Sequence, residues 1–203
     1  MSEPKLKSGI TTGSCSAAAA KAALLASLGD APIVVQIETP QGVCLSVPVL
    51  TAQATDGGGR ASVIKDAGDD PDITHGVEIV AEVQLTPGQP EISFQAGTGI
   101  GTVTLPGLQI PVGQPAINPA PRQMIESALR PLLPQGTGAV VTISIPEGEK
   151  LARRTLNPTL GIVGGLSIIG TTGIVEPMSE EAFKNSLKPQ ISVAKALGFQ
   201  AIV

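Results

Sequence analysis

The densest group of side chains that could do acid–base chemistry lies in one short segment, residues 63–76. It contains four carboxylates, a lysine and the only histidine of the chain, namely Asp66, Asp69, Asp70, Asp72, Lys65 and His75. Glycine and proline within the segment favour a loop between two strands, where charged groups can converge on a polar ligand. Crowded carboxylates raise the pKa of at least one member, which suits general base catalysis. The candidate catalytic residues are His75, Asp66, Asp69 and Asp70.

Two other interpretations of this segment stay open. An acidic turn exposed to solvent, with the histidine as a cap, would need no ligand. A metal site would need oxygen ligands at suitable spacing, but the segment has neither the spacing nor the closing glutamate of an EF-hand. Elsewhere the chain offers only Cys15 and Cys44, too few for a zinc site. We therefore expect no bound metal.

Glycines and hydroxyl side chains precede the first helix, at residues 8–14. Free N–H groups at a helix start, together with hydroxyls, can bind an anion such as a carboxylate. The spacing differs from that of a P-loop, so that kind of phosphate site is excluded. The sequence Thr-Thr-Gly at residues 171–173 repeats that at residues 11–13, which predicts two loops facing one ligand. A capped helix with a flexible lead-in, and a chance repeat, are the alternatives.

A glycine-rich stretch at 95–101 is followed by a proline-rich stretch at 105–119. The first resembles a dinucleotide-binding fingerprint, but Pro106 and Pro111 exclude the helix that such a motif requires. We predict a long, ordered connection that lines the site, with a purely structural connection as the alternative.

These segments depend on a series of short elements for their positions. Periodicity, caps and turn residues predict helices at 17–28, 121–130, 148–156, 179–187 and 190–197. Strands are predicted at 33–38, 43–47, 61–64, 77–85, 91–95, 102–105 and 139–145, with a flexible loop at 56–59. The fold class that follows is α+β, a mixed and mainly antiparallel sheet with packed helices.

The end of the chain has a different pattern. The last helix stops at Gly198, and a buried apolar strand is predicted at 199–203. A helix, a glycine and a buried strand are typical of the beginning of a parallel α/β unit. We therefore predict two domains, an α+β domain at 1–197 and the start of a truncated Rossmann-like α/β domain at 198–203. A last strand added to the first sheet is the alternative.

Composition excludes several classes of function. The 203 residues include three phenylalanines and neither tryptophan nor tyrosine, so a base-stacking surface is excluded. A net charge of −4 argues against a broad phosphate-binding face. Residues 1–7 lack the apolar core of a signal peptide, and the helix at 17–28 is too short to cross a bilayer. We expect a cytoplasmic protein that binds neither nucleic acid nor membrane; a homo-oligomer is left open.

Four stretches taken together resemble the CbiD family. They are residues 8–15 with the alanine run that follows, 61–76, 106–119 and 156–179. Matches in the same order over nearly the whole chain are more specific than any single motif. The resemblance implies transfer of a methyl group from S-adenosylmethionine to carbon C1 of cobalt-precorrin-5B, giving cobalt-precorrin-6A in anaerobic cobalamin biosynthesis. Family members also continue into a second, Rossmann-like half, in agreement with the predicted second domain.

The reaction that the resemblance implies suggests a task for each candidate residue. A base is useful where the macrocycle loses a proton, and the acidic segment can supply it. The peripheral carboxylates of the substrate would be held by Lys65, Thr11, Thr12, Gly13, Ser14 and Asn118. The methyl donor, S-adenosyl-L-methionine, would be bound by Thr171, Thr172 and Gly173.

Two other functions remain open. The chain could be a non-catalytic tetrapyrrole-binding fragment, with the methyl-donor site in the second domain. It could instead be an acyl or phosphoryl transfer enzyme that uses Thr12 or Ser14 at the helix start. The first alternative predicts tetrapyrrole binding without turnover, and the second predicts a covalent adduct on one hydroxyl.

Overall fold

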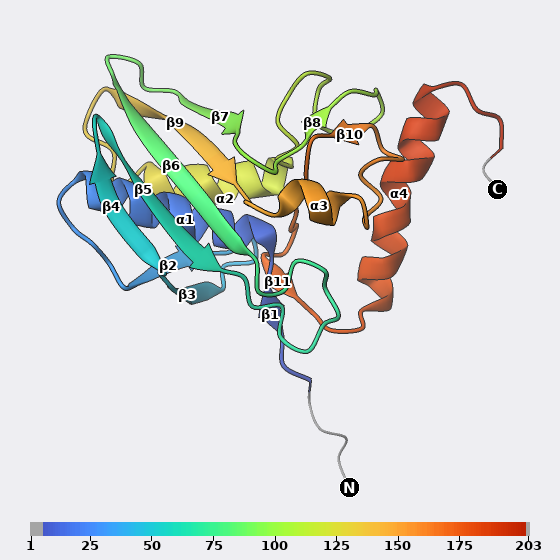
Figure 1. The fold of residues 1–203 in the computed structure, drawn as a ribbon, viewed down its shortest axis with the longest axis horizontal. Helices are drawn as coiled ribbons and strands as arrows, with labels where there is room; N and C mark the ends of the chain where they lie inside the picture. Colours follow the sequence, from blue (N-terminus) through green and yellow to red (C-terminus); the bar gives the residue numbers. More distant parts are fainter. Residues whose placement is uncertain (1–5, 202–203) are drawn as a thin grey trace, which may run out of the picture.

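The structure is a computed structural model that describes residues 6–201. Its centre is a five-stranded sheet in the order β4-β5-β6-β9-β7 (Figure 1). These strands are β4 (Thr51–Thr55), β5 (Gly58–Ile64), β6 (Glu78–Pro87), β9 (Thr137–Ser144) and β7 (Ile92–Ala96). All neighbours are antiparallel except β7 and β9, which run parallel. The expected α+β class with a mixed, mainly antiparallel sheet is confirmed.

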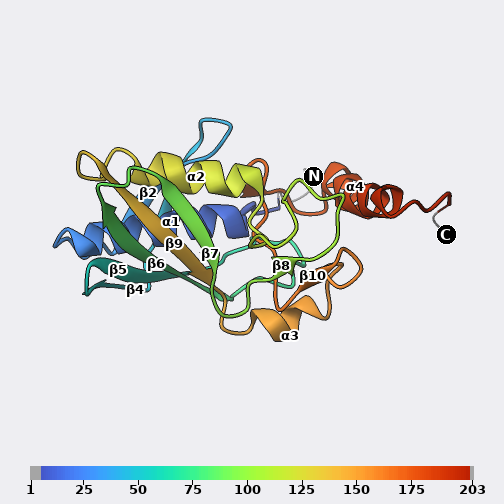
Figure 2. The same ribbon diagram turned by 90° about the horizontal axis from the view of Figure 1, so that it is seen from above.

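Two helices, α1 (Thr12–Ser27) and α2 (Pro119–Leu129), lie side by side against one face of this sheet (Figure 2). Thirteen of the 16 residues of α1 are buried, most of them alanines. Because alanine side chains are small, the sheet, α2 and strand β2 (Val34–Glu38) can all pack closely around this one helix. The hairpin that β2 forms with β3 (Cys44–Pro48) agrees with the prediction.

The packing of α1 on the sheet depends on a glycine in β5. A Cβ added to Gly59 would overlap the carbonyl oxygen of Ala23 in α1. Gly58 is restricted in the same way by the backbone of Val83 in the neighbouring strand. Since Gly58 and Gly59 belong to β5, the flexible loop expected at 56–59 is wrong. These glycines allow backbones to approach closely instead of making the chain flexible.

A second, smaller core lies beside the sheet, around the paired strands β8 (Thr102–Val103) and β10 (Ile162–Val163). The proline-rich stretch contributes Ile110 and Ala116 to this core and forms no helix or strand before α2, as expected. The short helix α3 (Gly148–Ala152) ends earlier than the 148–156 predicted. A further pair of short strands, β1 (Gly9–Ile10) and β11 (Ile174–Val175), joins the first residues to a late segment.

A single helix, α4 (Glu180–Ala196), replaces the two helices predicted at 179–187 and 190–197. Pro189 lies inside it, because a proline removes only one backbone donor and the hydrogen bonding continues on both sides. The helix stands at the edge of the molecule (Figure 1) and buries only Val193. Within the described part of the chain, no helix is long and apolar enough to cross a membrane.

The strand predicted at 199–203 does not form over residues 199–201. Gly198 has a positive φ, and the N–H of Phe199 donates to the carbonyl of Ala194 (3.0 Å), which closes the end of α4. Residues 202 and 203 lie outside the described range. The Rossmann-like domain expected from 198 onward stays a prediction.

Replacing Gly59 with alanine should destabilise the protein by about 3 kcal/mol, because the new Cβ can fit only if α1 shifts. The control is Gly136→Ala, where no atom lies near the added Cβ and the left-handed backbone alone costs about 1 kcal/mol. Urea unfolding measures both losses. Equal losses would show that the contact between β5 and α1 is not tight.

Candidate functional site

The acidic segment forms a loop that joins β5 to β6 beside β1 and β11 (Figure 1). Residues 65–76 are named the acidic loop below. Ser8 pairs with Gly68, and the N–H of Ile10 donates to the carbonyl of Asp66 (2.8 Å). The predicted loop between two strands is therefore confirmed, and backbone hydrogen bonds hold it against the residues around β1.

Lys65 is buried, with only 1% of its side chain exposed. Its Nζ donates to Oδ2 of Asp72 (2.7 Å). Oδ1 of Asp72 accepts both the N–H and the hydroxyl of Thr74. Burial by itself would raise the pKa of Asp72, but the hydrogen bonds from Lys65 and Thr74 together hold it below its ordinary value. Lys65 is thus paired with Asp72 inside the protein, and its predicted binding of substrate carboxylates stays a prediction.

Asp66 forms a second ion pair, at the exposed side of the loop. It accepts hydrogen bonds from Nζ of Lys7 (2.6 Å) and from the N–H of Gly68 (2.8 Å). The bond with Lys7 lowers the pKa of Asp66 and raises that of Lys7. Asp66 and Asp72 therefore both have lowered pKa values, because each has its own cation. The expectation that crowding would raise a pKa in this loop is wrong for these two carboxylates.

His75 exposes 56% of its side chain beside Asp66, whose Oδ1 lies 3.9 Å from Nδ1 of the ring. Nδ1 accepts the N–H of Ala67 (3.1 Å). A neutral imidazole that accepts at Nδ1 carries its proton on Nε2, which can donate to a ligand. The basic nitrogen is thus already occupied, so His75 suits a hydrogen-bond donor better than a general base.

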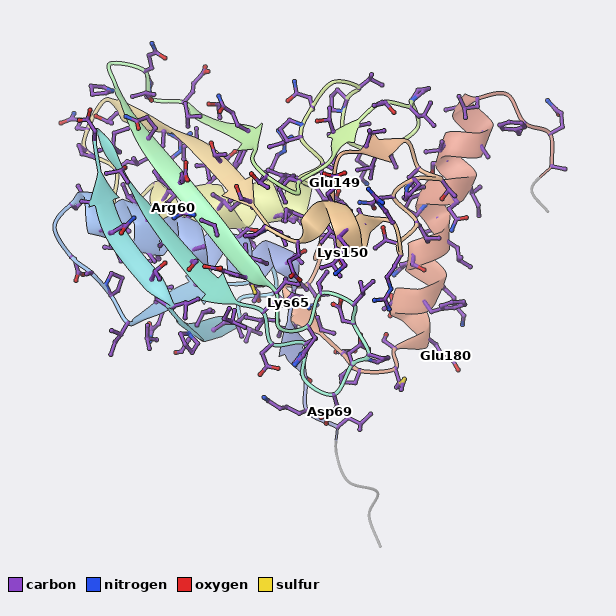
Figure 3. The ribbon with its side chains drawn as sticks, in the orientation of Figure 1. Arg60, Lys65, Asp69, Glu149, Lys150 and Glu180 are labelled. Atoms are coloured by element: carbon purple, nitrogen blue, oxygen red, sulfur yellow. The ribbon has the colours of Figure 1, made fainter. Side chains whose placement is uncertain are left out.

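Asp69 and Asp70 are each held through one carboxylate oxygen. Oδ2 of Asp69 accepts the N–H of Lys7 (2.6 Å), and Oδ1 of Asp70 accepts the N–H of Met178 (3.2 Å). Among the described residues, no donor contacts the other oxygen of either side chain. Asp70 is half-buried, whereas Asp69 is exposed at the outer end of the acidic loop (Figure 3). Each therefore has one oxygen that can accept a hydrogen bond from a ligand.

The hydroxyls at the start of α1 bind the protein itself. Oγ1 of Thr11, the N-cap, accepts the N–H of Ser14 (3.1 Å). Oγ of Ser14 donates to the carbonyl of Gly173 (2.6 Å), and Oγ1 of Thr12 donates to the carbonyl of Ile169 (3.1 Å). All three hydroxyl residues are more than nine-tenths buried. In this structure their hydroxyls bond to the protein itself, and their predicted binding of substrate carboxylates stays a prediction.

The two Thr-Thr-Gly segments lie next to each other, but they contact each other instead of sharing an open site. The N–H of Thr11 donates to the carbonyl of Gly173 (3.2 Å). Oγ1 of Thr172 bonds within its own turn, to the carbonyl of Ile174 (2.8 Å). Thr171 is exposed and is the member of the second segment that a methyl donor could reach.

Asn118 lies at the N-cap position of α2, close to the start of α1. A Cβ added to Gly13 would lie 2.9 Å from side-chain atoms of Pro121 and of Met124, which shows how closely the two helix starts approach. The Asn118 side chain is half-buried and caps no backbone N–H of its helix. Its predicted contact with a polar ligand stays a prediction.

Sequence reasoning missed a group of cations on and after α3. Lys150, Arg153 and Arg154 are exposed, and Figure 3 shows Lys150 on this helix. Arg153 lies 3.5 Å from Glu149, whereas Lys150 and Arg154 have no ion pair within the described range. Three of the 13 Lys and Arg residues fall within five positions, and this local excess was the available signal. Exposed cations of this kind can bind carboxylates.

Thiolate chemistry is excluded at Cys15, because burial raises the pKa of this thiol to about 12. Among residues 6–201, no three His, Cys, Asp or Glu side chains lie close enough together to hold a metal ion.

Comparisons with known proteins agree on one family. A family model described as CbiD matches residues 1–177. The cobalt-precorrin-5B C(1)-methyltransferase of Moorella thermoacetica is 54% identical over 200 residues, which cover 98% of this chain and 54% of that protein. The enzymes of the same name from Desulfitobacterium hafniense and Methanocaldococcus jannaschii are 55% and 51% identical, covering 97% and 98% of this chain and 51% and 55% of theirs.

A solved structure is also similar. The 1.9 Å crystal structure of the cobalamin biosynthesis protein (cbiD) from Archaeoglobus fulgidus superposes with a TM-score of 0.66 at 35% identity. The match covers 91% of this chain and 59% of that one. The chain therefore spans about half the length of the curated relatives it matches.

The ion pair of Asp72 predicts how stability depends on pH. Because its pKa is lower in the folded state, ionised Asp72 stabilises the fold above a pH of about 4. This contribution is lost as the pH falls through the lowered pKa. The difference in unfolding free energy between the wild type and Asp72→Asn, measured in urea, should be constant from pH 7 to 5 and shrink below pH 4. A difference that stays constant to pH 2, or that Asp56→Asn reproduces, contradicts the assignment.

Proposed function

The chain belongs to the CbiD family, and on that premise we propose that it acts in the methylation of carbon C1 of cobalt-precorrin-5B. The observation that carries the proposal is identity of about half over nearly the whole chain with several proteins of that name. S-adenosyl-L-methionine as methyl donor and a cytoplasmic location belong to the same proposal. The product is cobalt-precorrin-6A.

In a methyl transfer of this kind, the main contribution of the protein is to position the methyl donor and the macrocycle. Carbon C1 attacks the methyl carbon, the carbon–sulfur bond breaks, and its electron pair returns to sulfur to leave a neutral thioether. A proton that the macrocycle then loses must pass to a base. Asp70 suits this task best, because one oxygen is fixed by Met178 and the other is free. Asp69 is the neighbouring candidate, and Asp66 stays ionised beside Lys7.

The substrate carries many peripheral carboxylates, and the structure changes which residues are proposed to hold them. Lys65 is buried with Asp72, so exposed Lys150 and Arg154 take its place. Asn118 at the start of α2 and the Nε2–H of His75 can add neutral donors.

The internal hydrogen bonds at the start of α1 favour a second candidate, a tetrapyrrole-binding role without the methyl-donor site. Ser14 and Thr172 are both engaged with backbone carbonyls, which leaves few free groups for a donor. In that case the donor site lies in the part of the relatives that this chain does not match. An acyl or phosphoryl transfer enzyme is disfavoured, because Thr12 and Ser14 are buried.

Calorimetry with S-adenosyl-L-methionine distinguishes the two roles. We expect binding to the intact Moorella thermoacetica relative and at least about 100-fold weaker binding to this chain, a difference of about 2.7 kcal/mol. Equal affinities would place the donor site within these 203 residues, and Thr171 would be the first residue to change. Absence of binding to both proteins would remove S-adenosyl-L-methionine from the proposal.

Asp70→Asn should lower turnover by about 100-fold or more, with little change in substrate affinity, because the amide keeps the shape of the loop but cannot take up a proton. The assay follows methyl transfer to the macrocycle by the intact Moorella thermoacetica relative, with the substitution made at the aligned position. Asp56→Asn, in the exposed turn between β4 and β5, is the control. Wild-type turnover of the Asp70 variant would exclude Asp70 as the base.

A further inference from the structure

One side of α4 presents large apolar residues to solvent. Phe183, Leu187 and Ile191 follow one another at a spacing of four, so they share one face of the helix. They are 68%, 42% and 55% exposed, and Phe199 just after the helix is 64% exposed. These four residues are named the α4 face. Three of them, Leu187, Ile191 and Phe199, line a shallow hollow of about 500 Å³ between the helix and residues 199–201.

The first half of α4 has almost no packing of its own. Every residue from 181 to 188 is exposed, and Val193 is the one buried residue of the helix. Isolated helices of this length are marginal in water, and in proteins most of their stability comes from burying one apolar face. A helix that shows two turns free on all sides, with phenylalanine and leucine among them, therefore points to a covering partner.

The length of the relatives identifies that partner. The alignment with the Moorella thermoacetica protein includes 98% of this chain, and so includes α4, but only 54% of the relative. Nearly half of that protein must therefore pack somewhere against the matched half. We propose that the α4 face is the docking surface for the further half that the relatives carry. Its partner surface is expected to be apolar, with carboxylates at the rim facing Lys188 and Lys195.

The beginning of α4 is bonded to the acidic loop of the candidate site. Met178, just before the N-cap Ser179, has a φ of 57°, which is strained for a residue other than glycine. Its N–H donates to Oδ1 of Asp70 in the acidic loop. A partner that covers the first turn of α4 would therefore lie beside the segment that is bonded to Asp70. The docking proposal itself does not depend on the reaction.

Hydrogen exchange read by mass spectrometry tests the proposal on two molecules. In this chain the amides of residues 181–188 should exchange rapidly. In the intact Moorella thermoacetica relative the aligned amides should exchange at least about 100-fold more slowly. Strands β5 and β6 give the internal reference, since they should be equally protected in both. Rapid exchange of the aligned helix in the intact relative overturns the proposal.

A second copy of the chain is the competing occupant, and sedimentation velocity decides that point. We expect the wild type to remain monomeric over a concentration series, and the double variant Phe183→Glu with Ile191→Glu to behave identically. Ile33→Glu, at a residue that is 82% exposed in another part of the surface, is the control. The proposal is overturned in favour of self-association if the wild type is a dimer, the double variant is a monomer and the control variant is still a dimer.

Discussion

The close approach of β5 to α1 is the contact on which the remaining structure depends. Gly59 lets the strand meet the backbone of Ala23, and the alanines of α1 let α2 and β2 approach from other directions. A helix surrounded in this way has one position relative to the sheet, since close-packed interiors leave little room for adjustment. The start of α1 is therefore fixed, and the segment that bonds to Ser14 and Thr12 is fixed with it.

Charge is distributed in the acidic loop by pairing and not by crowding. Lys65 neutralises Asp72 inside the molecule, and Lys7 neutralises Asp66 outside it. A buried ion pair contributes little net stability, but it specifies one loop arrangement because any other leaves a buried charge without a partner. What remains is a rigid loop with free carboxylate oxygens on Asp69 and Asp70.

Local signals in the sequence predicted most elements correctly, since caps and turns act through a few neighbouring residues. The hairpin of β2 and β3 and the glycine that ends α4 are examples. The errors concern residues whose partners are distant in the sequence. From the sequence alone Gly59 indicates a flexible loop, whereas in the structure it lies against the backbone of Ala23. Ser14 suggests a ligand donor until a carbonyl 159 residues away accepts its hydroxyl.

The same reason explains which site residues were found. The acidic loop is one continuous segment, so its composition alone drew attention to it. Whether the Lys65 side chain points toward solvent or into the core depends on tertiary packing, which a short sequence pattern does not indicate. In the structure it is buried and paired with Asp72. The cations around α3 were visible as a local excess but had no motif to mark them.

The hydrogen bond between Asp70 and Met178 joins two surfaces that would otherwise be separate. A ligand that moved Asp70 would therefore act on the residue just before α4, and a partner that moved this residue would act on Asp70. Thermodynamic linkage then requires reciprocity: the factor by which one strengthens the binding of the other is the same in both directions.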